Sequence, residues 1–457
     1  MARARIVNTL RRRLLGSAAG SLALAPAAKV LAAMPGYSRL MEGPMVGAVT
    51  PDSLTIWARA SGPLPVAVEY SADPRFVATR TTPAVLASEA NDFTARITLT
   101  GLEPATRYYY RVRVDEGVDR YKREPFATRT APARSVPFRV AFGSCARRTL
   151  DPEQPIFRSI AARSPDLFLW LGDNIYGDTP FQAVLEEEYR KQRAVQTLQP
   201  LLRSVPQLAT WDDHDFGLNN SDRTNPVREG SLAAFRNYWA NPQYGLPDVP
   251  GVFFRYAYGG IDFFFIDGRY YRDPNSGPDG PAKTMLGARQ KQWLKAELRA
   301  SRAPFKVVIS GSGWSSEDGP TGDTWSAFLT ERDELFEFIR TEAIAGVLLL
   351  SGDTHFGEIN CIPWSERGGY DFYDLVSSPL AQHTGTSFLD HEPEMRIRAP
   401  YFRSCNFGEL DFRFEPEPSV TFTLRDVIGD AAFAPLTLRA RDLTNGRSTW
   451  REHIDRK

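Results

Sequence analysis

Hydrophobic and polar residues follow two different patterns along this chain of 457 residues, and the change falls near residue 130. Between about residues 37 and 130, apolar and polar residues alternate over short stretches, such as 53–59 and 66–70, which are separated by proline, glycine and aspartate turn signals. Alternation with a period of two is typical of strands that bury one face. The pattern predicts a small all-β domain over residues 37–130.

From residue 137 to the end, short apolar stretches alternate with longer amphipathic ones, such as residues 182–193 and 286–299. Apolar runs suit buried strands and amphipathic runs suit helices, so this alternation indicates an α/β domain over residues 137–457. The predicted strands of this domain are residues 138–142, 167–171, 207–210, 261–266, 306–309 and 346–350. Residues 408–414 and 420–424 return to alternating strands and are expected to complete the second sheet.

The first 33 residues are predicted to be a targeting signal. Arg11-Arg12-Arg13-Leu14-Leu15 precedes a short stretch rich in alanine and leucine, and small residues that suit cleavage follow it. Paired arginines followed by two leucines favour a twin-arginine signal. The apolar stretch is too short to span a membrane, and no other transmembrane candidate is found. We therefore expect residues 1–33 to engage the twin-arginine (Tat) export machinery, and the mature protein to be periplasmic or secreted.

Charge and cysteine content exclude several classes of protein. The chain has 55 basic and 55 acidic residues, and the first 33 residues contain six basic residues and no acidic one. A mildly acidic mature protein lacks the basic face that binds duplex nucleic acid, although a bound metal would still attract a small anion. Three cysteines are too few for a disulfide scaffold, and Cys361 and Cys405 either pair or stay free.

Four predicted strands end directly in clusters of polar side chains. The clusters are Gly143-Ser144-Cys145, Gly172-Asp173-Asn174-Ile175-Tyr176, Asp212-Asp213-His214-Asp215 and Ser351-Gly352-Asp353-Thr354-His355. In open α/β sheets, ligands bind beyond the carboxyl ends of the strands, so these clusters are expected to converge. One acidic strand end is an ordinary cap for the next helix, whereas four such ends indicate a site.

The side chains of these clusters indicate a metal site rich in oxygen ligands. Only His214 and His355 supply nitrogen there and only Cys145 supplies sulfur, so a zinc pair with several imidazoles per ion does not fit. Oxygen ligands suit calcium, magnesium, manganese or ferric iron. Cys145 and Tyr176, if they are ligands, favour a transition metal at one position. A cation would also relieve the repulsion among the carboxylates.

These clusters resemble the motifs of calcineurin-like metallophosphoesterases, with two departures. Ser144-Cys145 replaces the usual Asp-x-His, and Gly352-Asp353-Thr354-His355 replaces Gly-His-x-His. With the preceding all-β domain and the twin-arginine signal, these departures resemble the alkaline phosphatase D (PhoD-like) family. The run Phe265-Ile266-Asp267-Gly268-Arg269 also matches that family.

The resemblance extends over nearly the whole chain from Tyr37 onward and implies the fold. It implies an α/β (α+β) metallophosphoesterase-like sandwich of two mixed sheets flanked by helices. A small fibronectin type III-like domain would precede it, and the run from Gly101 to Val112 is similar to the end of such a domain. In these domains a tyrosine at a strand start anchors the corner of the β-sandwich.

The resemblance also implies which residues bind metal. The implied ligands are Cys145, Asp173, Tyr176, Asp213, Asn220, Asp353 and His355. Asp173 would bridge the metals, and Cys145 and Tyr176 would bind Fe3+. The remaining ligands would include those of Ca2+, with Asn219 as the alternative to Asn220. Mn2+ and Zn2+ remain alternatives for the identity of the metals.

The implied reaction is hydrolysis of a small phosphate ester by attack of a metal-activated hydroxide. His214, positioned by Asp215, would face the substrate and either protonate the leaving alkoxide or stabilise its charge. Arg269 and Arg272 would contact the phosphate, because a guanidinium matches phosphate oxygens; structural ion pairs are the alternative for both. Asn174 would also contact the substrate.

Two other functions stay open beside this exported phosphatase or phosphodiesterase. The first is a phospholipase D-like phosphodiesterase that acts on phospholipid head groups and would show an apolar rim around the pocket. The second is a non-catalytic cell-surface binding protein whose β-sandwich recognises glycan or protein. Such a protein would have lost its metal ligands, which are intact in this sequence, so the enzyme is the prediction.

Overall fold

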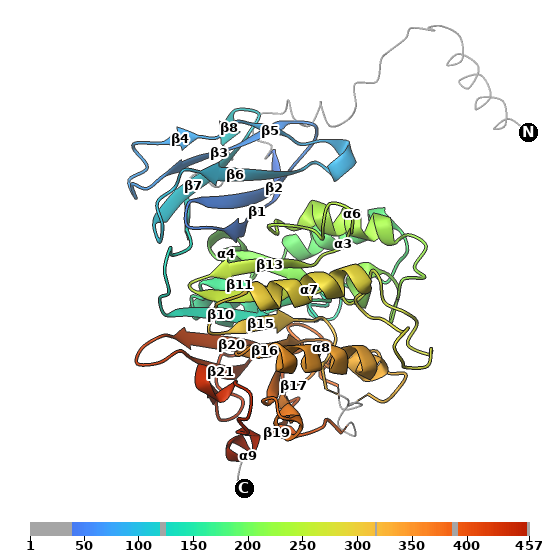
Figure 1. The fold of residues 1–457 in the computed structure, drawn as a ribbon. Coiled ribbons are helices and arrows are strands. Elements are labelled where there is room, and N and C mark those ends of the chain that lie inside the picture. The colour runs from blue at the N-terminus through green and yellow to red at the C-terminus, as the bar shows by residue number, and fades with distance from the viewer. Residues whose placement is uncertain (1–38, 119–124, 316–317, 386–391, 455–457) are drawn as a thin grey trace, which may run out of the picture. The chain divides into compact units, whose positions relative to one another are not determined.

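The structure is a computed structural model, and it describes residues 39–118, 125–315, 318–385 and 392–454 (Figure 1). The predicted signal at residues 1–33 lies outside the described residues. Among the residues that are described, no helix combines the length and the apolar character that a membrane span requires.

The alternating residues at the start of the described chain form strands β1 to β9. Their bounds are β1 (Leu40–Val49), β2 (Ser53–Ala60), β3 (Pro65–Ser71), β4 (Arg80–Thr81), β5 (Val85–Leu86), β6 (Thr94–Thr100), β7 (Arg107–Val114), β8 (Gly117–Val118) and β9 (Phe126–Arg129), with the short helix η1 (Glu89–Asn91) between β5 and β6. One sheet has the order β1-β2-β6, and the other pairs β3 and β7 with β4, β5, β8 and β9. Alternate residues of β7 are buried because their side chains face the other sheet.

A tyrosine corner closes this β-sandwich, as the sequence predicts. Tyr108, near the start of β7, accepts a hydrogen bond on its hydroxyl oxygen from the backbone N–H of Glu103 at 2.9 Å. The bond joins the strand to the turn that precedes it, which is the arrangement known from fibronectin type III-like and immunoglobulin-like sandwiches.

Two larger sheets form the rest of the protein. Their strands are β10 (Phe138–Gly143), β11 (Leu167–Leu171), β12 (Gln207–Thr210), β13 (Phe254–Tyr258), β14 (Ile261–Phe265), β15 (Lys306–Ile309), β16 (Val347–Ser351), β17 (Gly357–Ile362), β18 (Phe372–Val376), β19 (Arg396–Tyr401), β20 (Asn406–Arg413), β21 (Ser419–Asp426) and β22 (Leu436–Arg439). The orders are β12-β11-β10-β20-β21-β22 and β13-β14-β15-β16-β18-β17-β19. Both sheets are mixed, because parallel pairs such as β10–β11 and β15–β16 lie beside antiparallel pairs such as β10–β20 and β13–β14.

Helices connect the strands of these sheets. They are α2 (Ile156–Ala162), α3 (Gln182–Arg193), α4 (Gln199–Ser204), α5 (Asp213–Phe216), α6 (Arg228–Tyr238), α7 (Ala288–Ala300), α8 (Leu329–Thr341), α9 (Trp450–His453) and the short helices η2 (Trp325–Phe328), η3 (Trp364–Arg367) and η4 (Ala440–Asp442). The amphipathic stretches predicted as helices correspond to α3 and α7.

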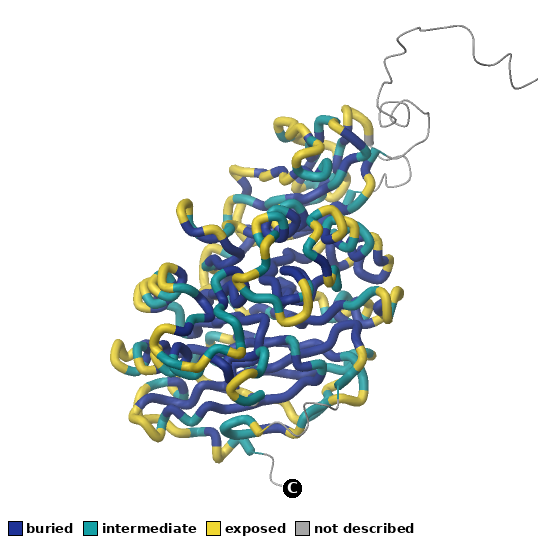
Figure 2. The backbone as a smooth tube through the Cα atoms, turned by 90° about the vertical axis from the view of Figure 1, so that its right-hand side faces the viewer, coloured by how far each residue is buried: buried dark blue, intermediate teal, exposed yellow. Residues whose placement is uncertain are grey.

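Aromatic side chains fill the space between the two large sheets. Phe412 of β20 stacks on Phe138 of β10 and meets Phe263 of β14, in the other sheet, edge to face. All six predicted strands of this region are present, with their ends shifted by at most one residue. Figure 2 shows buried backbone along the strands and exposure concentrated in the loops and outer turns. The predicted fold class, a sandwich of two mixed sheets with helices after an all-β region, is confirmed.

The all-β region packs directly against the rest of the chain. The indole N–H of Trp57 in β2 donates to the backbone oxygen of Asn237 in α6 at 2.7 Å. The hydroxyl of Tyr256 in β13 donates to the backbone oxygen of Val49 in β1 at 2.6 Å. By their contacts, the described residues form one unit. The division into domains at residues 37–130 and 137–457 stays a prediction.

Candidate metal centre

The predicted strand ends converge, and backbone hydrogen bonds hold them together. The N–H of Cys145, after β10, donates to the oxygen of Gly172, after β11, and the N–H of Ala146 donates to the oxygen of Asp173 at 2.9 Å. The N–H of Asp353, after β16 of the other sheet, donates to the hydroxyl of Ser144 at 3.2 Å. Segments from both large sheets therefore meet at one point.

Several residues at this point have left-handed backbone conformations. Positive φ angles occur at Cys145 (59°), Asp173 (49°), Asp353 (68°) and His355 (58°), none of which is glycine. Such conformations are uncommon for residues with a Cβ atom, and they concentrate at functional sites. The strain at four predicted ligands supports a site at these strand ends.

Gly172 allows the loops after β11 and β12 to approach each other. Its φ angle is +98°, and a Cβ atom there would lie 2.6 Å from the Cβ of Asp212. Any other residue would both strain the backbone and push the two acidic loops apart. The glycine in the Gly-Asp-Asn run is therefore required for the close packing of the carboxylates.

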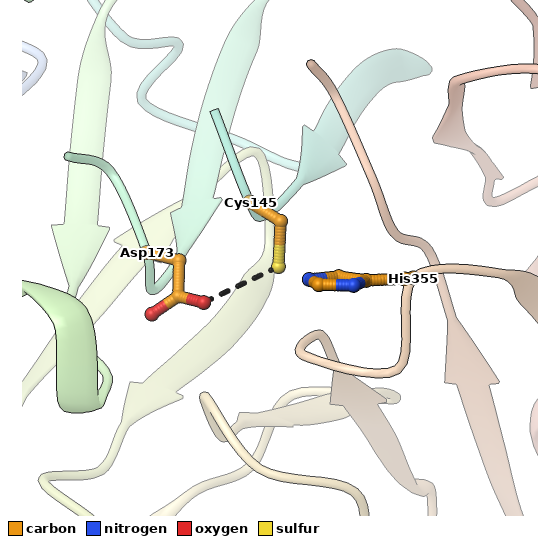
Figure 3. Close-up of side chains that lie close together, drawn as sticks. All are labelled: Cys145, Asp173 and His355. Atoms are coloured by element: carbon orange, nitrogen blue, oxygen red, sulfur yellow. Dashed lines mark hydrogen bonds between the residues drawn. The ribbon is translucent and has the colours of Figure 1, made fainter. Parts of the chain in front are cut away.

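Cys145, Asp173 and His355 form the first group of side chains with metal-binding atoms (Figure 3). Their ligand atoms all lie within 4.8 Å of one another, and the thiol of Cys145 is 3.4 Å from Oδ2 of Asp173. The hydroxyl of Tyr176 lies 3.3 Å from the same Oδ2 and 3.3 Å from Nε2 of His355. Four predicted ligands thus surround one point.

Asp173 also belongs to a second group. Its carboxylate, a carboxylate oxygen of Asp213 and a ring nitrogen of His214 lie within 4.8 Å of one another. Asp173 is the member common to both groups of metal-binding atoms. That its carboxylate bridges two metals stays a prediction.

The buried carboxylates have oxygens without hydrogen-bond donors. Oδ1 of Asp173, Oδ2 of Asp212 and Oδ1 of Asp213 are buried and have no hydrogen-bond partner among the described residues. An unpartnered buried carboxylate oxygen is costly, because desolvation is not offset by any donor. Bound cations would offset that cost, so the donor set fits metal binding.

Burial and mutual repulsion raise the pKa values of this cluster. Burial raises the pKa of Asp173 well above its usual range, and the charges of Asp213, Asp212 and Asp353 raise it further. Burial raises the pKa of Asp353 too, together with the charges of Asp212 and Asp213. Burial also raises the pKa of Asp212 to about 6. In the absence of added positive charge, burial and mutual repulsion therefore favour the protonated forms of these carboxyl groups.

The remaining groups of the site are perturbed in ways that suit ligands. Burial raises the pKa of the Cys145 thiol, and the charges of Asp173 and Asp353 add to it. Burial likewise raises the pKa of the Tyr176 hydroxyl, followed by the charges of Cys145 and Asp173. Burial lowers the pKa of His355 to about 4, so its imidazole is neutral, which is the form that binds metal.

His214 has a different partner from the one predicted. Its Nδ1 donates to Oδ1 of Asp178 at 2.5 Å, and its ring lies 4.2 Å from that of Tyr176, centroid to centroid. Burial lowers the pKa of His214, but the charge of Asp173 and the bond to Asp178 outweigh it and give a pKa of about 10. The prediction that Asp215 positions His214 is therefore wrong, because the residue that holds the His214 ring is Asp178.

Asp215 and Asn174 organise the backbone instead. Asp215 accepts hydrogen bonds from the backbone N–H groups of Asn174 at 3.1 Å and Asp212 at 3.2 Å, and from the hydroxyl of Tyr189 at 2.9 Å. The amide of Asn174 donates to the backbone oxygen of Thr210 at 2.8 Å, and the residue is fully buried. A contact between Asn174 and substrate is therefore wrong for this structure, because its side chain has no exposed surface.

Arg269 and Arg272 are also fully buried. Arg269 donates to both carboxylate oxygens of Asp323, at 3.0 and 2.7 Å, and forms an ion pair with Asp212. Arg272 donates to Asp323 at 2.9 Å. The prediction that these arginines contact the phosphate is wrong for this structure, because carboxylates already occupy their donors. The alternative, structural ion pairs, is confirmed.

Two further predicted ligands lie at the edge of the groups. The backbone N–H of Asn220 donates to Oδ2 of Asp213 at 2.7 Å, while its side-chain oxygen accepts from Asn219. Asp353 places its backbone oxygen 3.8 Å from the thiol of Cys145. Its carboxylate lies outside both groups of metal-binding atoms among the described residues. Metal binding by the side chains of Asn220 and Asp353 stays a prediction.

Two residues of the site were not predicted from the sequence. Asp178 follows Asp173 by five residues, and its proximity to the motif is the one available signal. Arg147 follows Cys145 by two residues and places its guanidinium carbon 5.1 Å from the centroid of the Tyr176 ring. Neither position belongs to a predicted strand end. The three cysteines, including Cys361 and Cys405, are free.

Comparison with known proteins identifies relatives of most of the chain. The sequence profile of the PhoD-like phosphatases matches residues 140–416, and that of the PhoD-like phosphatase N-terminal domain matches residues 25–132. Alkaline phosphatase D of Bacillus subtilis (strain 168) is 26% identical over 400 residues, which cover 74% of this chain and 67% of that protein.

Two solved structures share the fold. A structure of PhoD has a TM-score of 0.70 and 20% identity, covering 88% of this chain and 92% of that one. Purple acid phosphatase PPD1 from yellow lupin (Lupinus luteus) seeds has a TM-score of 0.64 and 14% identity, covering 87% of this chain and 74% of that one. At these identities the structures support the fold alone. Because the phosphatase profile matches more than half of the chain, the protein is a phosphoric ester hydrolase and belongs to the PhoD-like phosphatase family.

Proposed function

We propose that the protein is an exported, metal-dependent phosphatase or phosphodiesterase that hydrolyses small phosphate esters at the two groups around Asp173. The observation that carries the proposal is the shared carboxylate of Asp173, with buried oxygens on Asp173 and Asp213 that lack a hydrogen-bond donor among the described residues. Two adjacent cations would satisfy these oxygens. The family membership supplies the reaction class.

We assign Fe3+ to the group of Cys145, Tyr176, Asp173 and His355, and Ca2+ to the side of Asp213. Binding as thiolate and phenolate requires a cation strong enough to reverse the raised pKa values of Cys145 and Tyr176. A trivalent ion meets this requirement better than a divalent one. The carboxylates on the other side suit a hard divalent cation. Asp353 and Asn220 are proposed as further ligands.

Three residues of the chain have proposed roles in the reaction beside metal binding. When bound, the cations would polarise the phosphoryl oxygens and make a water molecule acidic enough to supply the nucleophile. His214 donates a proton to the oxygen of the leaving group, and Asp178 holds its ring by the bond to Nδ1. The buried ion pair between Arg269 and Asp212 fixes the start of helix α5, which carries Asp213 and His214.

Export and domain structure complete the proposal. The twin arginines at Arg11 and Arg12 support transport through the Tat pathway to the periplasm or exterior. This route carries folded proteins, which suits a site assembled from distant strand ends. The all-β region of residues 37–130 and the metal-binding region of residues 137–457 are proposed as separate domains.

Metal analysis together with ester hydrolysis tests the proposal. Protein purified without chelator is expected to contain about one iron with calcium, to hydrolyse a phosphomonoester or a phosphodiester, and to lose activity on chelation. The ratio of the two ester rates then identifies the preferred substrate class. A protein that stays metal-free and inactive after incubation with iron, calcium, manganese and zinc would contradict the proposal.

Replacing Asp178 by asparagine tests the role of His214. The variant is expected to lower kcat roughly 10- to 100-fold for an alkyl phosphate, because the imidazole loses the carboxylate that supports its proton donation. The loss should be smaller for nitrophenyl phosphate, whose leaving group needs little protonation. Steady-state kinetics on both substrates provide the measurement.

The control for this variant is Asp248→Asn, which removes a carboxylate from an exposed ion pair with Arg289. Its kinetics should match those of the wild type. Equal losses on both substrates in Asp178→Asn would instead mean that Asp178 acts on metal binding or folding.

A further inference from the structure

In the described structure, neither of the two arginines that were predicted to contact the phosphate is available for that contact. Arg269 and Arg272 are fully buried, and Asp323 occupies donors of both. Replacing that carboxylate by substrate phosphate would leave Asp323 buried and unpaired, which is costly. The side chain that binds the phosphoryl group must therefore be sought on the accessible side of the metal ligands.

Arg147 lies on that side. Its backbone N–H donates to the oxygen of Ala381 at 2.8 Å, and Ala146 forms a parallel bridge with Ala381. The backbone two residues after the ligand Cys145 is thus held in place. The side chain is half-buried, whereas Arg269 and Arg272 have no exposed surface.

The guanidinium of Arg147 is oriented but not neutralised. Its carbon lies 5.1 Å from the centroid of the Tyr176 ring, and its Nε is 3.4 Å from the hydroxyl of Thr149. None of the ion pairs found between described residues includes Arg147, whereas its neighbour Arg148 faces Glu188 at 4.0 Å. Stacking on an aromatic ring fixes the plane of a guanidinium and leaves its N–H edge available to an anion.

The contact with Tyr176 places Arg147 near both sides of the site. The ring of Tyr176 lies 4.2 Å from that of His214, centroid to centroid, and its hydroxyl lies 3.3 Å from Nε2 of His355. His214 is the proposed proton donor and His355 belongs to the first metal-binding group, so Arg147 lies near both ends of the proposed reaction.

We propose that Arg147 is the phosphate-binding residue of this site and donates hydrogen bonds to the non-bridging oxygens of the substrate phosphoryl group. The inference rests on the proposed function and specifies how the substrate is held. Arginine suits the task because its paired N–H groups match two phosphate oxygens. Tyr176 then has two contacts, with its hydroxyl toward the metal-binding atoms and its ring against Arg147.

The variants Arg147→Gln and Arg147→Lys test this assignment in the metal-loaded full chain. Hydrogen bonds to a charged group contribute about 1.5–3 kcal/mol, which corresponds to roughly 10- to 150-fold in affinity. Arg147→Gln is expected to raise KM for a phosphomonoester and the inhibition constant of inorganic phosphate by a common factor in that range. Its kcat and metal content should change little, and Arg147→Lys should be intermediate.

Arg148→Gln is the matched control, because it removes the same charge one residue away. It should leave KM and phosphate inhibition near the wild-type values, and an equal rise in both variants would indicate a general field effect and overturn the assignment. Unchanged KM and phosphate inhibition in Arg147→Gln would also overturn it. So would a loss of metal with an unchanged KM, which would mean that Arg147 only supports Tyr176.

Calorimetric titration with inorganic phosphate separates this inference from the proposed function. If the wild type binds phosphate but hydrolyses no ester, the proposed function fails, and weaker phosphate binding in Arg147→Gln still supports the residue assignment. If the wild type hydrolyses esters and Arg147→Gln binds phosphate equally well, the residue assignment fails and the proposed function stands.

Discussion

Replacement of Asp173 by asparagine is expected to lower kcat/KM by about 10³-fold or more and to reduce the bound metal. Asp173 is the common member of both groups of metal-binding atoms, so the change removes a ligand from each. Losing even one preorganised charge contact in an active site costs about 10²–10³-fold in rate. Elemental analysis and ester hydrolysis on the same preparation provide the measurement.

The same substitution should stabilise the metal-free protein at alkaline pH. Burial raises the pKa of folded Asp173 above its unfolded value, so the folded state holds more protons through that interval, and stability falls as the pH rises across it. Asp212, with a pKa of about 6, and Asp215, with a pKa of about 7, add to the same trend. Asparagine removes the Asp173 contribution. Urea unfolding with chelator is therefore expected to give Asp173→Asn the larger free energy of unfolding at pH 8 and to show little difference near pH 4.

A buried carboxylate outside the site provides the control. Asp371 accepts hydrogen bonds from the backbone N–H groups of Thr449 and Trp450 at the start of α9. Asp371→Asn should lower the free energy of unfolding without changing metal content or kcat/KM, because its carboxylate stabilises the fold by those bonds. If Asp173→Asn kept its metal and activity, the two groups would have no catalytic role.

The location of the site was predictable because strand ends are recognisable in the sequence. β11 is apolar throughout and β16 is apolar up to its last residue, Ser351, and each strand is followed at once by glycine and aspartate. Since ligands of α/β proteins bind beyond the carboxyl ends of strands, Asp173 and Asp353 could be assigned to one region from the sequence, although β11 and β16 lie in different sheets. The departures from the metallophosphoesterase motifs at Cys145 and Asp353 were likewise visible in the sequence.

Side-chain direction was harder to predict, and Asp215 shows why. Asp212 is the N-cap of α5 and Asp215 occupies its third position, so the carboxylate of Asp215 turns back to the N–H of Asp212. This capping-box spacing directs Asp215 away from His214 and was visible in the sequence. Because Asp215 and His214 are adjacent in sequence, they were predicted to form a pair, but the geometry of helix α5 directs the two side chains to different partners.

Other partners depend on tertiary packing that no local pattern encodes. Asp178 reaches His214 across 36 positions, and Asp323 reaches Arg269 across 54. An arginine near an acidic motif carries the same sequence signal whether it faces substrate or a buried carboxylate. The burial of Arg269 and the half-exposure of Arg147 distinguish these two cases, and only the three-dimensional structure supplies that information.

Arg269→Met is expected to lower the free energy of unfolding by about 3–5 kcal/mol, because it leaves Asp212 buried without its cation, whereas Asp323 keeps Arg272. Adding Asp212→Asn to this variant should restore part of the loss, since the uncompensated charge is then removed. Urea unfolding of the metal-loaded proteins at pH 7.5 measures both effects. The activity of Arg269→Met should fall as a consequence, because Asp212 is the N-cap of helix α5, which carries Asp213 and His214.

Arg255→Met is the matched control for this experiment. Arg255 also contacts two carboxylates, Asp262 and Glu297, each at 2.9 Å, but 34% of its side chain is exposed. Solvent screens the pair with Glu297, and the buried Asp262 keeps its hydrogen bond from the hydroxyl of Ser301, so the loss of Arg255 should cost at most about 1 kcal/mol. If Arg269→Met instead kept its stability within about 1 kcal/mol and lost kcat/KM, Arg269 would contact the phosphate directly. Arg269 and Arg255 form similar ion pairs but differ in burial. A structural role of Arg269 therefore predicts a large loss of stability in Arg269→Met and a small one in Arg255→Met, whereas direct contact with the phosphate predicts a small loss in both.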